Sequence, residues 1–213
     1  MSYESFPESP RASLRIGDLA PDFTARSTAG PVRLSDFRQQ WLILFSHPAD
    51  FTPVCTTEFV ALARAAGQFA ERDCALMALS VDSLYSHFAW LRLIRDRTGV
   101  EVRFPIIEDP TMVIARAYGM VGTEDADSAA VRTTFFIDPA GTIRAMTSYP
   151  ANVGRSIPEM LRTLDALRAV GEGHLAPADW HPGDDLLSPP SATLDGVFAA
   201  QEPTDWFLKG AAK

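Results

Sequence analysis

The sequence has few cysteines, no cluster of basic side chains and no long apolar run, and each absence excludes a class of protein. Two cysteines in 213 residues are too few for a disulfide framework and favour a reducing compartment. The 19 basic and 27 acidic side chains give a net charge of -8, which disfavours binding to nucleic acid or anionic lipid. The N-terminal residues lack the apolar region of a secretory signal, and no stretch approaches the roughly 20 apolar residues of a membrane span. We therefore expect a cytoplasmic protein without a nucleic acid or membrane partner.

Short apolar runs alternate with amphipathic stretches along the first 170 residues. The apolar runs are short enough to be buried strands, and the stretches between them carry apolar residues at helical spacing. Strands are predicted at 41–47 and 74–81, helices at 56–73, 84–97 and 157–170, a short hairpin near 22–34 and a longer hairpin at 131–149. The alternation predicts an α/β fold with a central mixed β-sheet flanked by helices, the layout of thioredoxin-like folds.

The chain beyond residue 170 has a different composition. It is rich in proline and shows little periodicity, yet it contains Trp180, Phe198, Trp206 and Phe207. Such a density of large apolar groups is unusual for a disordered segment. We therefore expect a domain at 1–170 and a C-terminal arm at 171–213 that packs either on its own domain or on a second subunit.

The stretch S-H-P-A-D-F-T-P-V-C-T-T-E at 46–58 carries the most distinctive chemistry. Threonine is a favoured helix N-cap and proline a favoured first helical residue, so a helix should begin at Pro53 with Thr52 as its cap. Cys55 then lies in the first turn, where unpaired N–H groups and the helix dipole favour an anion. Thiolate is the reactive form of cysteine, so this position favours a reactive thiol. Pro48, which fixes its own backbone, would form part of the pocket wall.

Two charged residues bear on the reactivity of Cys55. Glu58 lies one turn further along the helix and by itself disfavours the thiolate through like-charge repulsion, so a cation is needed to offset it. Arg132 opens a buried strand, where an arginine usually has a carboxylate or oxyanion partner. Cys74 begins a buried strand and is interpreted as structural. His47 could orient the site or could be a structural histidine, and no histidine or cysteine spacing indicates a metal site.

The pattern P-x-x-x-T-x-x-C, formed by Pro48, Thr52 and Cys55, resembles the active-site signature of the peroxiredoxins. The longer stretch F-S-H-P-A-D-F-T-P-V-C-T-T-E is similar to the one-cysteine, Prx6-type branch, and further matches run in order from G-D-L-A-P-D-F to P-A-D-W-H-P-G-D. The resemblance implies a thioredoxin-like fold without a cofactor. It also implies that the C-terminal arm helps to form a homodimer or a higher oligomer.

The resemblance also implies residue roles in an antioxidant peroxidase. Cys55 would be the peroxidatic cysteine, which attacks hydrogen peroxide or an organic hydroperoxide and becomes a sulfenic acid. Thr52 and Arg132 would bind the peroxide oxygens, and Pro48 would shield the sulfur. Preorganised donors and a fixed cation suit the negative charge that develops on the leaving oxygen.

Supporting roles follow from the same resemblance. Glu58 would hold Arg132, His47 would line the pocket, and Arg155 would be a second basic group near it. The C-terminal sequence T-D-W-F-L-K-G-A-A-K lacks a resolving cysteine, so an external thiol, glutathione or a dithiol protein, would regenerate the enzyme. Animal members of this branch carry a phospholipase motif G-D-S-W-G, but Gln40 stands here in place of its serine, so that activity is not expected.

Three alternatives compete with a peroxidase. A thiol–disulfide oxidoreductase would need C-x-x-C, but Glu58 occupies the second cysteine position. An esterase or phospholipase would need a G-x-S-x-G elbow, which is absent. A peroxide sensor or holdase that uses Cys55 without efficient turnover is compatible with the same residues, so this alternative stays open.

Overall fold

The computed structural model describes residues 14–121, 131–171 and 173–210. The N-terminal residues 1–13, where no signal sequence is expected, lie outside the described residues. The chain forms two compact units, Met1–Arg155 and Ser156–Lys213, and each is described by itself. The division expected at residue 170 remains a prediction.

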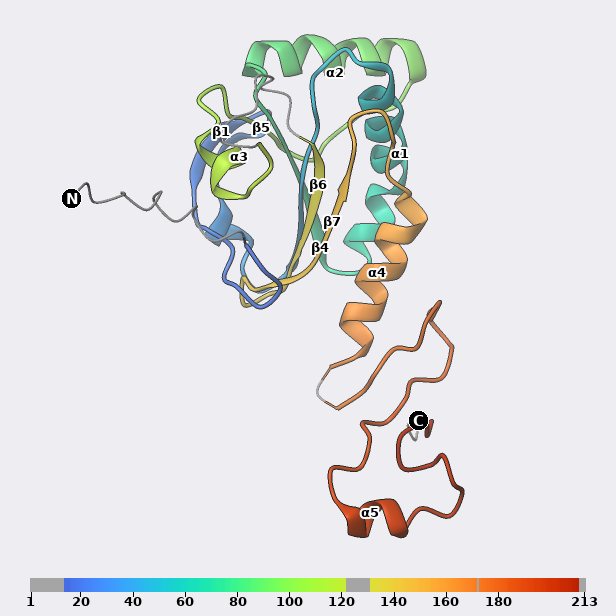
Figure 1. The fold of residues 1–213 in the computed structure, drawn as a ribbon. Coiled ribbons are helices and arrows are strands. Elements are labelled where there is room, and N and C mark those ends of the chain that lie inside the picture. Colours follow the sequence, from blue (N-terminus) through green and yellow to red (C-terminus); the bar gives the residue numbers. More distant parts are fainter. Residues whose placement is uncertain (1–13, 122–130, 172, 211–213) are drawn as a thin grey trace, which may run out of the picture. The chain divides into compact units, whose positions relative to one another are not determined.

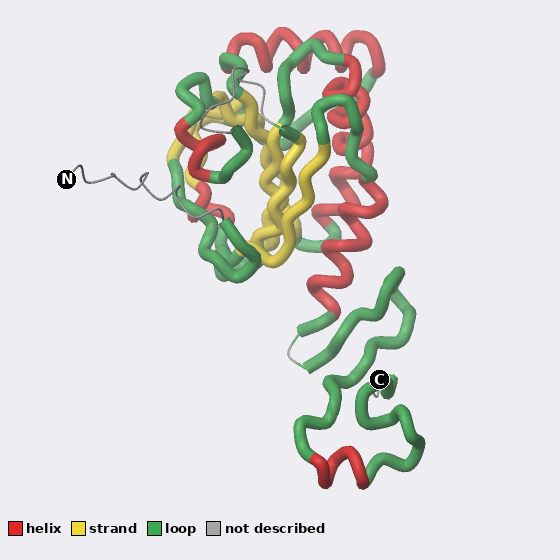
Figure 2. Tube along the Cα trace, in the orientation of Figure 1, coloured by secondary structure: helices red, strands yellow, loops and turns green. Residues whose placement is uncertain are grey.

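The first unit is built around one seven-stranded mixed sheet (Figures 1 and 2). Its strand order is β2-β1-β5-β4-β3-β6-β7. The strands are β1 (Thr24–Ser27), β2 (Gly30–Arg33), β3 (Trp41–Ser46), β4 (Cys74–Ser80), β5 (Ile106–Glu108), β6 (Arg132–Ile137) and β7 (Ile143–Tyr149). Strands β3, β4 and β5 are parallel, whereas the β1–β2 and β6–β7 hairpins pair antiparallel. The central strands are buried on both faces, which explains their continuous apolar sequences.

Helices cover both faces of this sheet. The helices of the first unit are η1 (Leu34–Phe37, a 3-10 helix), α1 (Pro53–Ala70), α2 (Leu84–Thr98) and α3 (Val113–Ala117). Successive side chains of β3 point to opposite faces. Phe45 packs against Phe59 of α1, while Leu44 joins the cluster that contains Ile114 of α3. Helix α3 therefore covers the face opposite to that of α1, as its separate position in Figure 1 also shows.

The structure confirms the predicted fold class, a thioredoxin-like mixed sheet flanked by helices. Helix α1 begins at Pro53, as the Thr-Pro pair predicts, and Arg132 opens β6. The predicted strand 41–47 is one residue shorter, because pairing of β3 with β4 ends at Ser46 and leaves His47 at the start of the following loop. Both predicted hairpins are present.

The second unit contains two helices, α4 (Ile157–Ala169) and α5 (Leu194–Phe198). A long loop connects them, and another loop follows α5. Helix α4 begins with an N-cap, in which the Ser156 side chain accepts a hydrogen bond from the Glu159 N–H. Of the four aromatic residues noted in the C-terminal sequence, Trp180 is buried, whereas Phe198, Trp206 and Phe207 are exposed. Among the residues that the structure describes, no helix has the length and apolarity needed to cross a bilayer.

Candidate active site

The candidate nucleophile lies where a buried strand turns into a helix. Strand β3 ends at Ser46, the loop 47–52 follows, and Cys55 is the third residue of α1. The Cys55 side chain is unpaired with any other cysteine and has no exposed surface. The Cys55 thiol is therefore buried and also lies at the N-terminal end of a helix, the end at which the helix dipole favours an anion.

Thr52 occupies the N-cap position, but its hydroxyl does not cap the helix. It donates a hydrogen bond to the Ala49 carbonyl at 2.9 Å instead, which closes the loop on itself. The neighbouring Phe51 has a φ of 57°, in the left-handed region that non-glycine residues rarely adopt. A left-handed conformation of this kind persists only where the surrounding structure constrains the loop. Pro48, in the same loop, is buried.

Arg132 approaches the cysteine from the adjacent strand. Because β3 and β6 are antiparallel, the start of β6 lies at the same edge of the sheet as the end of β3. Arg132 Nη1 lies 3.3 Å from Cys55 Sγ, and its Nε and Nη2 donate to the Ala151 carbonyl at 3.0 and 2.7 Å. Arg132 is one of the largest fully buried side chains of the described residues. These bonds fix the guanidinium beside the sulfur.

Glu58 joins Arg132 to a second arginine. Its carboxylate accepts from Arg132 Nη1 at 2.6 Å, from Arg155 Nε at 2.9 Å and from Arg155 Nη2 at 2.9 Å. It also accepts from the backbone N–H of Arg155 at 2.7 Å. Burial acts to raise the pKa of the Glu58 carboxyl, but the hydrogen bonds and charges of Arg155 and Arg132 outweigh it, so the pKa is lowered. Glu58 is therefore ionised, and the cluster of one carboxylate and two guanidiniums carries a net positive charge beside Cys55.

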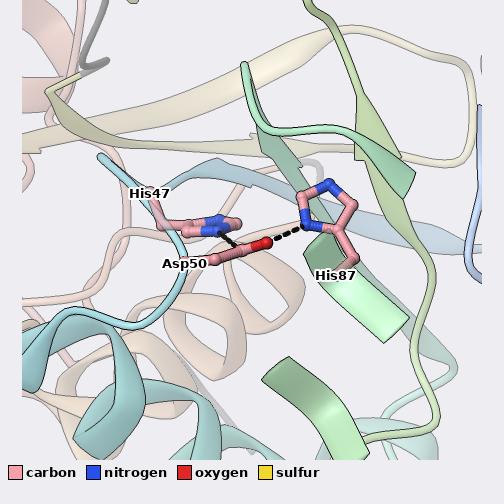
Figure 3. Close-up of side chains that lie close together, drawn as sticks. All are labelled: His47, Asp50 and His87. Atoms are coloured by element: carbon pink, nitrogen blue, oxygen red, sulfur yellow. Dashed lines mark hydrogen bonds and ion pairs between the residues drawn. The ribbon is translucent and has the colours of Figure 1, made fainter. Parts of the chain in front are cut away.

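His47 belongs to a second buried cluster, formed with Asp50 and His87 (Figure 3). Asp50 lies between the two rings: His47 Nε2 is 3.0 Å from Asp50 Oδ1, and His87 Nδ1 is 2.7 Å from Asp50 Oδ2. His47 also stacks on Trp90, with ring centroids 5.4 Å apart, and meets Phe59 edge to face at 4.8 Å. All three members of the cluster are buried.

The charges of this second cluster follow from its hydrogen bonds. Burial acts to raise the pKa of Asp50, but the hydrogen bonds from both histidines outweigh it and lower the pKa to about 2. Burial lowers the pKa of His47, and the positive charges of His87 and Arg155 act in the same direction against the opposing effect of Asp50. His47 is therefore a neutral ring next to an ionised carboxylate.

The same three side chains could hold a metal ion, because they offer one ligand atom each and these atoms lie within 4.8 Å of one another. An ion would have to displace the hydrogens that the two rings direct at the Asp50 oxygens. The hydrogen bonds account for the arrangement of the cluster without an ion, and we assign no metal to it.

The structure thus brings four of the sequence-predicted residues into one contact network, namely Cys55, Glu58, Arg132 and Arg155. Pro48 and Thr52 lie in the loop before Cys55, and the Thr52 hydroxyl faces the Ala49 carbonyl. Sequence reasoning missed Asp50 and His87. The H-x-x-D spacing of His47 and Asp50 was a usable signal, but nothing in the linear sequence points to His87, which comes from α2.

Comparisons with known proteins agree with this geometry. The model of the AhpC/TSA family matches residues 16–146. The chain is 46% identical over 216 residues to peroxiredoxin 2 of Caldanaerobacter subterraneus subsp. tengcongensis, with 98% of each chain covered. It is 44% identical over 210 residues to the peroxiredoxin of Aquifex aeolicus, which covers 91% of this chain and 95% of that protein.

Solved structures give the same result. The chain resembles a yeast mitochondrial 1-Cys peroxiredoxin with a TM-score of 0.83 and 38% identity, over 94% of this chain and 100% of the other. It resembles a mutant of peroxiredoxin 6 of Arenicola marina with a TM-score of 0.78 and 34% identity, over 87% of this chain and 88% of the other. Both are peroxiredoxins, and one is a one-cysteine protein by name. The chain belongs to the AhpC/TSA family and, within it, to the peroxiredoxins, which are thiol-dependent peroxidases.

Proposed function

We propose that Cys55 is the peroxidatic cysteine and that the enzyme reduces hydrogen peroxide and small organic hydroperoxides as an antioxidant. The observation that supports this most directly is the 3.3 Å approach of Arg132 Nη1 to Cys55 Sγ in the first turn of α1. A fixed cation and a helix N-terminus act on the same sulfur, which is the kind of environment in which reactive cysteines are found. The complete burial of Cys55 restricts access to small oxidants.

The proposed first step is a two-electron oxidation of the sulfur. The Cys55 thiolate attacks the terminal oxygen of the hydroperoxide, the S–O bond forms, and the O–O bond breaks. The hydrogen on that oxygen remains with it, so the product is the sulfenic acid, and the alkoxide or hydroxide that leaves takes a proton from solvent. The leaving oxygen gains negative charge in the transition state, which a preorganised guanidinium stabilises.

Arg132 and Thr52 would bind the peroxide oxygens, and the buried Pro48 would shield the sulfur from water. Arg132 is suited to this role because Ala151 and Glu58 hold it in place without removing its charge. The Thr52 hydroxyl gives its hydrogen to Ala49 and therefore offers its lone pairs as acceptors for the peroxide hydrogen. Glu58 and Arg155 would hold Arg132 in position, and His47 would line the pocket.

Regeneration by an external thiol is supported by the position of Cys74. In the register of the sheet, Cys74 pairs with Trp41 at the start of β3, whereas Cys55 follows the end of that six-residue strand. Six strand residues span roughly 20 Å, far more than a disulfide bridges. Two thiols from outside would reduce the sulfenic acid, first to a mixed disulfide with loss of water and then to the free thiol. The solved structure of the yeast relative concerns its thiol resolution through glutathione and thioredoxin systems.

We also infer that residues 171–213 are an arm that packs on a second subunit in a homodimer, in a cytoplasmic protein. The exposed aromatic side chains of Phe198, Trp206 and Phe207 support the arm, because a lone chain gains nothing from displaying them. The presence of only two cysteines in 213 residues supports the compartment. Removal of residues 171–213 should weaken self-association, and an unchanged sedimentation profile would contradict the arm.

The test of the peroxidase proposal is stopped-flow oxidation of the reduced protein by hydrogen peroxide, followed by tryptophan fluorescence. Oxidation should be rapid in the parent and in Cys74→Ser and absent in Cys55→Ser. A parent that reacts no faster than free cysteine would overturn the proposal. Steady-state turnover with glutathione or a dithiol protein then separates an enzyme from a peroxide sensor that uses the same cysteine.

A further inference from the structure

Helix α2 contacts the catalytic turn on both sides of Cys55. His87 Nδ1 lies 2.7 Å from the Asp50 carboxylate, in the loop before Cys55. Trp90 Nε1 donates at 3.2 Å to Thr56 Oγ1, immediately after Cys55. His87 and Trp90 are three residues apart and therefore project from the same face of α2. One helix face thus contacts Asp50, five positions before the nucleophile, and Thr56, immediately after it.

Asp50 makes hydrogen bonds that connect the loop before Cys55 to its surroundings. Its carboxylate bonds to both histidines, and its backbone N–H donates to Asp82 Oδ2 at 2.8 Å. Asp82 Oδ2 is itself held by the Ser80 hydroxyl at 2.9 Å, at the end of β4. Side chain and backbone of Asp50 are therefore bonded to its own loop, to α2 and to the connection between β4 and α2. The adjacent left-handed Phe51 is the kind of backbone conformation that persists only under such constraint.

Asp50 also determines how the His47 ring is protonated. An ionised carboxylate only accepts hydrogen bonds, so the ring nitrogen that faces it must carry a hydrogen. A neutral His47 ring has a single N–H, which is then on Nε2, and Nδ1 is a bare acceptor. The His47 Nδ1 is buried and has no hydrogen-bond partner among the described residues. The ring is thus hydrogen-bonded to Asp50 on one side only, and it also packs against the rings of Trp90 and Phe59.

We propose that Asp50 and His87 are positioning residues of the peroxide site: the Asp50–His87 hydrogen bond holds the loop that carries His47, Pro48 and Thr52 in the arrangement that receives the peroxide beside Cys55. This inference rests on the proposed function of Cys55. Neither residue is required to touch the peroxide. Both act through the loop, so loss of their bond should impair the placement of the peroxide more than the intrinsic reactivity of the thiolate.

The test compares two reactions of Cys55 in the full chain. Oxidation by hydrogen peroxide requires correctly placed oxygens, whereas alkylation by iodoacetamide, followed at the Cys55 peptide by mass spectrometry, requires only an accessible thiolate. The variants are His87→Leu, which removes the donor to Asp50, and His87→Asn, whose amide can donate from nearly the same place. Asp50→Asn is a third variant, in which one amide must face two ring N–H groups.

We expect the second-order rate constant for peroxide to fall about tenfold to 100-fold in His87→Leu and Asp50→Asn, since misplacement of a reacting group by about 1 Å has effects of that size. His87→Asn should recover most of the parent rate, and alkylation should not fall by more than about twofold in any of the three. Equal losses in both reactions, or a His87→Leu variant as fast as the parent, would overturn the inference.

The outcomes also separate this inference from the function on which it rests. If the parent itself does not react with peroxide, the proposed function fails. If the parent reacts rapidly and His87→Leu does so equally, only the positioning role fails. If Asp50→Asn does not fold, the comparison of His87→Leu with His87→Asn still tests the positioning role, because both variants keep the buried Asp50 carboxylate.

Discussion

Two carboxylates are buried near the candidate nucleophile, only eight positions apart in the sequence, and they face different kinds of basic side chain. Glu58 faces the guanidinium groups of Arg132 and Arg155, whereas Asp50 faces the imidazoles of His47 and His87. A guanidinium stays charged at every physiological pH, while an imidazole can give up its proton. The Glu58 network therefore supplies a constant positive charge, and the Asp50 network supplies a geometry whose charge depends on pH.

Removal of each carboxylate in turn is the strongest test of this difference between the two networks. Glu58→Ala would leave two buried guanidiniums without their shared partner, and we expect it to lower the free energy of unfolding by about 3–5 kcal/mol. Asp50→Ala leaves two rings that can remain neutral, so a smaller loss of about 1–3 kcal/mol is expected for their unsatisfied N–H groups. Urea denaturation monitored by circular dichroism measures both. Equal losses would show that the two networks do not differ as described.

The second comparison is between the two arginines of the Glu58 network. Arg132→Met should slow oxidation of Cys55 by peroxide about 10²- to 10³-fold, the size of effect seen when a donor to a developing oxyanion is removed. Arg155→Met should have a smaller effect, because Arg155 contacts Glu58, whereas Arg132 lies within hydrogen-bond distance of the sulfur. Stopped-flow fluorescence gives both rate constants. If the Arg155 variant is as slow as the Arg132 variant, the charge of the whole cluster, rather than the Arg132 contact, determines the rate.

The pH dependence of stability should separate the two networks. The pKa of His47 is lowered from 6.5 by burial, so below pH 6.5 the unfolded chain binds a proton that the folded chain does not, and stability falls as the pH decreases. One such group gives a slope of at most about 1.4 kcal/mol per pH unit. The lowered pKa values of Glu58 and Asp50 affect the free energy of unfolding only at lower pH. The contribution of ionised Glu58 is lost below pH 4.5, and that of ionised Asp50 is lost between pH 3.8 and about 2.

His47→Asn tests the contribution of His47 to the pH dependence of stability. The variant should show a flatter dependence of unfolding free energy on pH between 6.5 and 5 than the parent, whatever its absolute stability. Asp50, His87 and Arg155 all act on the His47 ring, so they must be left intact in this experiment. Identical slopes in parent and variant would mean that His47 does not titrate differently in the folded and unfolded chains.

The smallest effect is expected at the protein surface. Arg92 and Asp96 form an i,i+4 pair at 3.7 Å on α2, with exposed side chains. Exposed pairs of this kind contribute little because water and salt screen them, so Arg92→Ala should change the free energy of unfolding by less than about 0.5 kcal/mol. The variant serves as a control for the buried substitutions. A loss comparable to that of Asp50→Ala would undermine the distinction between buried and exposed charges.

The sequence predicted local structure well, because local structure depends on near neighbours along the chain. Thr52-Pro53 located the start of α1 and hence the position of Cys55, and the apolar runs located β3 and β4. It could not predict that the Thr52 hydroxyl would bond to Ala49 rather than cap the helix. Several conformations of that loop satisfy the same sequence, and tertiary contacts select one.

Long-range pairs were the weakest part of the sequence prediction. Arg155 was expected near the site only through family resemblance, and its bonds to Glu58 join residues 97 positions apart. His87 was not expected at all, although its bond to Asp50 closes a buried cluster. A histidine on an amphipathic helix looks the same in sequence whether it faces solvent or a carboxylate. Only the packing of α2 against the loop distinguishes these cases.

The complete burial of Cys55 has a consequence for the timing of the proposed catalytic cycle. A slender oxidant can reach the sulfur through small fluctuations of the surrounding loop, but a tripeptide or protein thiol is too bulky to do so. The reductive half of the cycle therefore has to wait for the first turn of α1 or the preceding loop to open. Turnover should then level off as the reductant concentration rises, at a ceiling set by the opening rate of the protein rather than by the chemistry of the thiol.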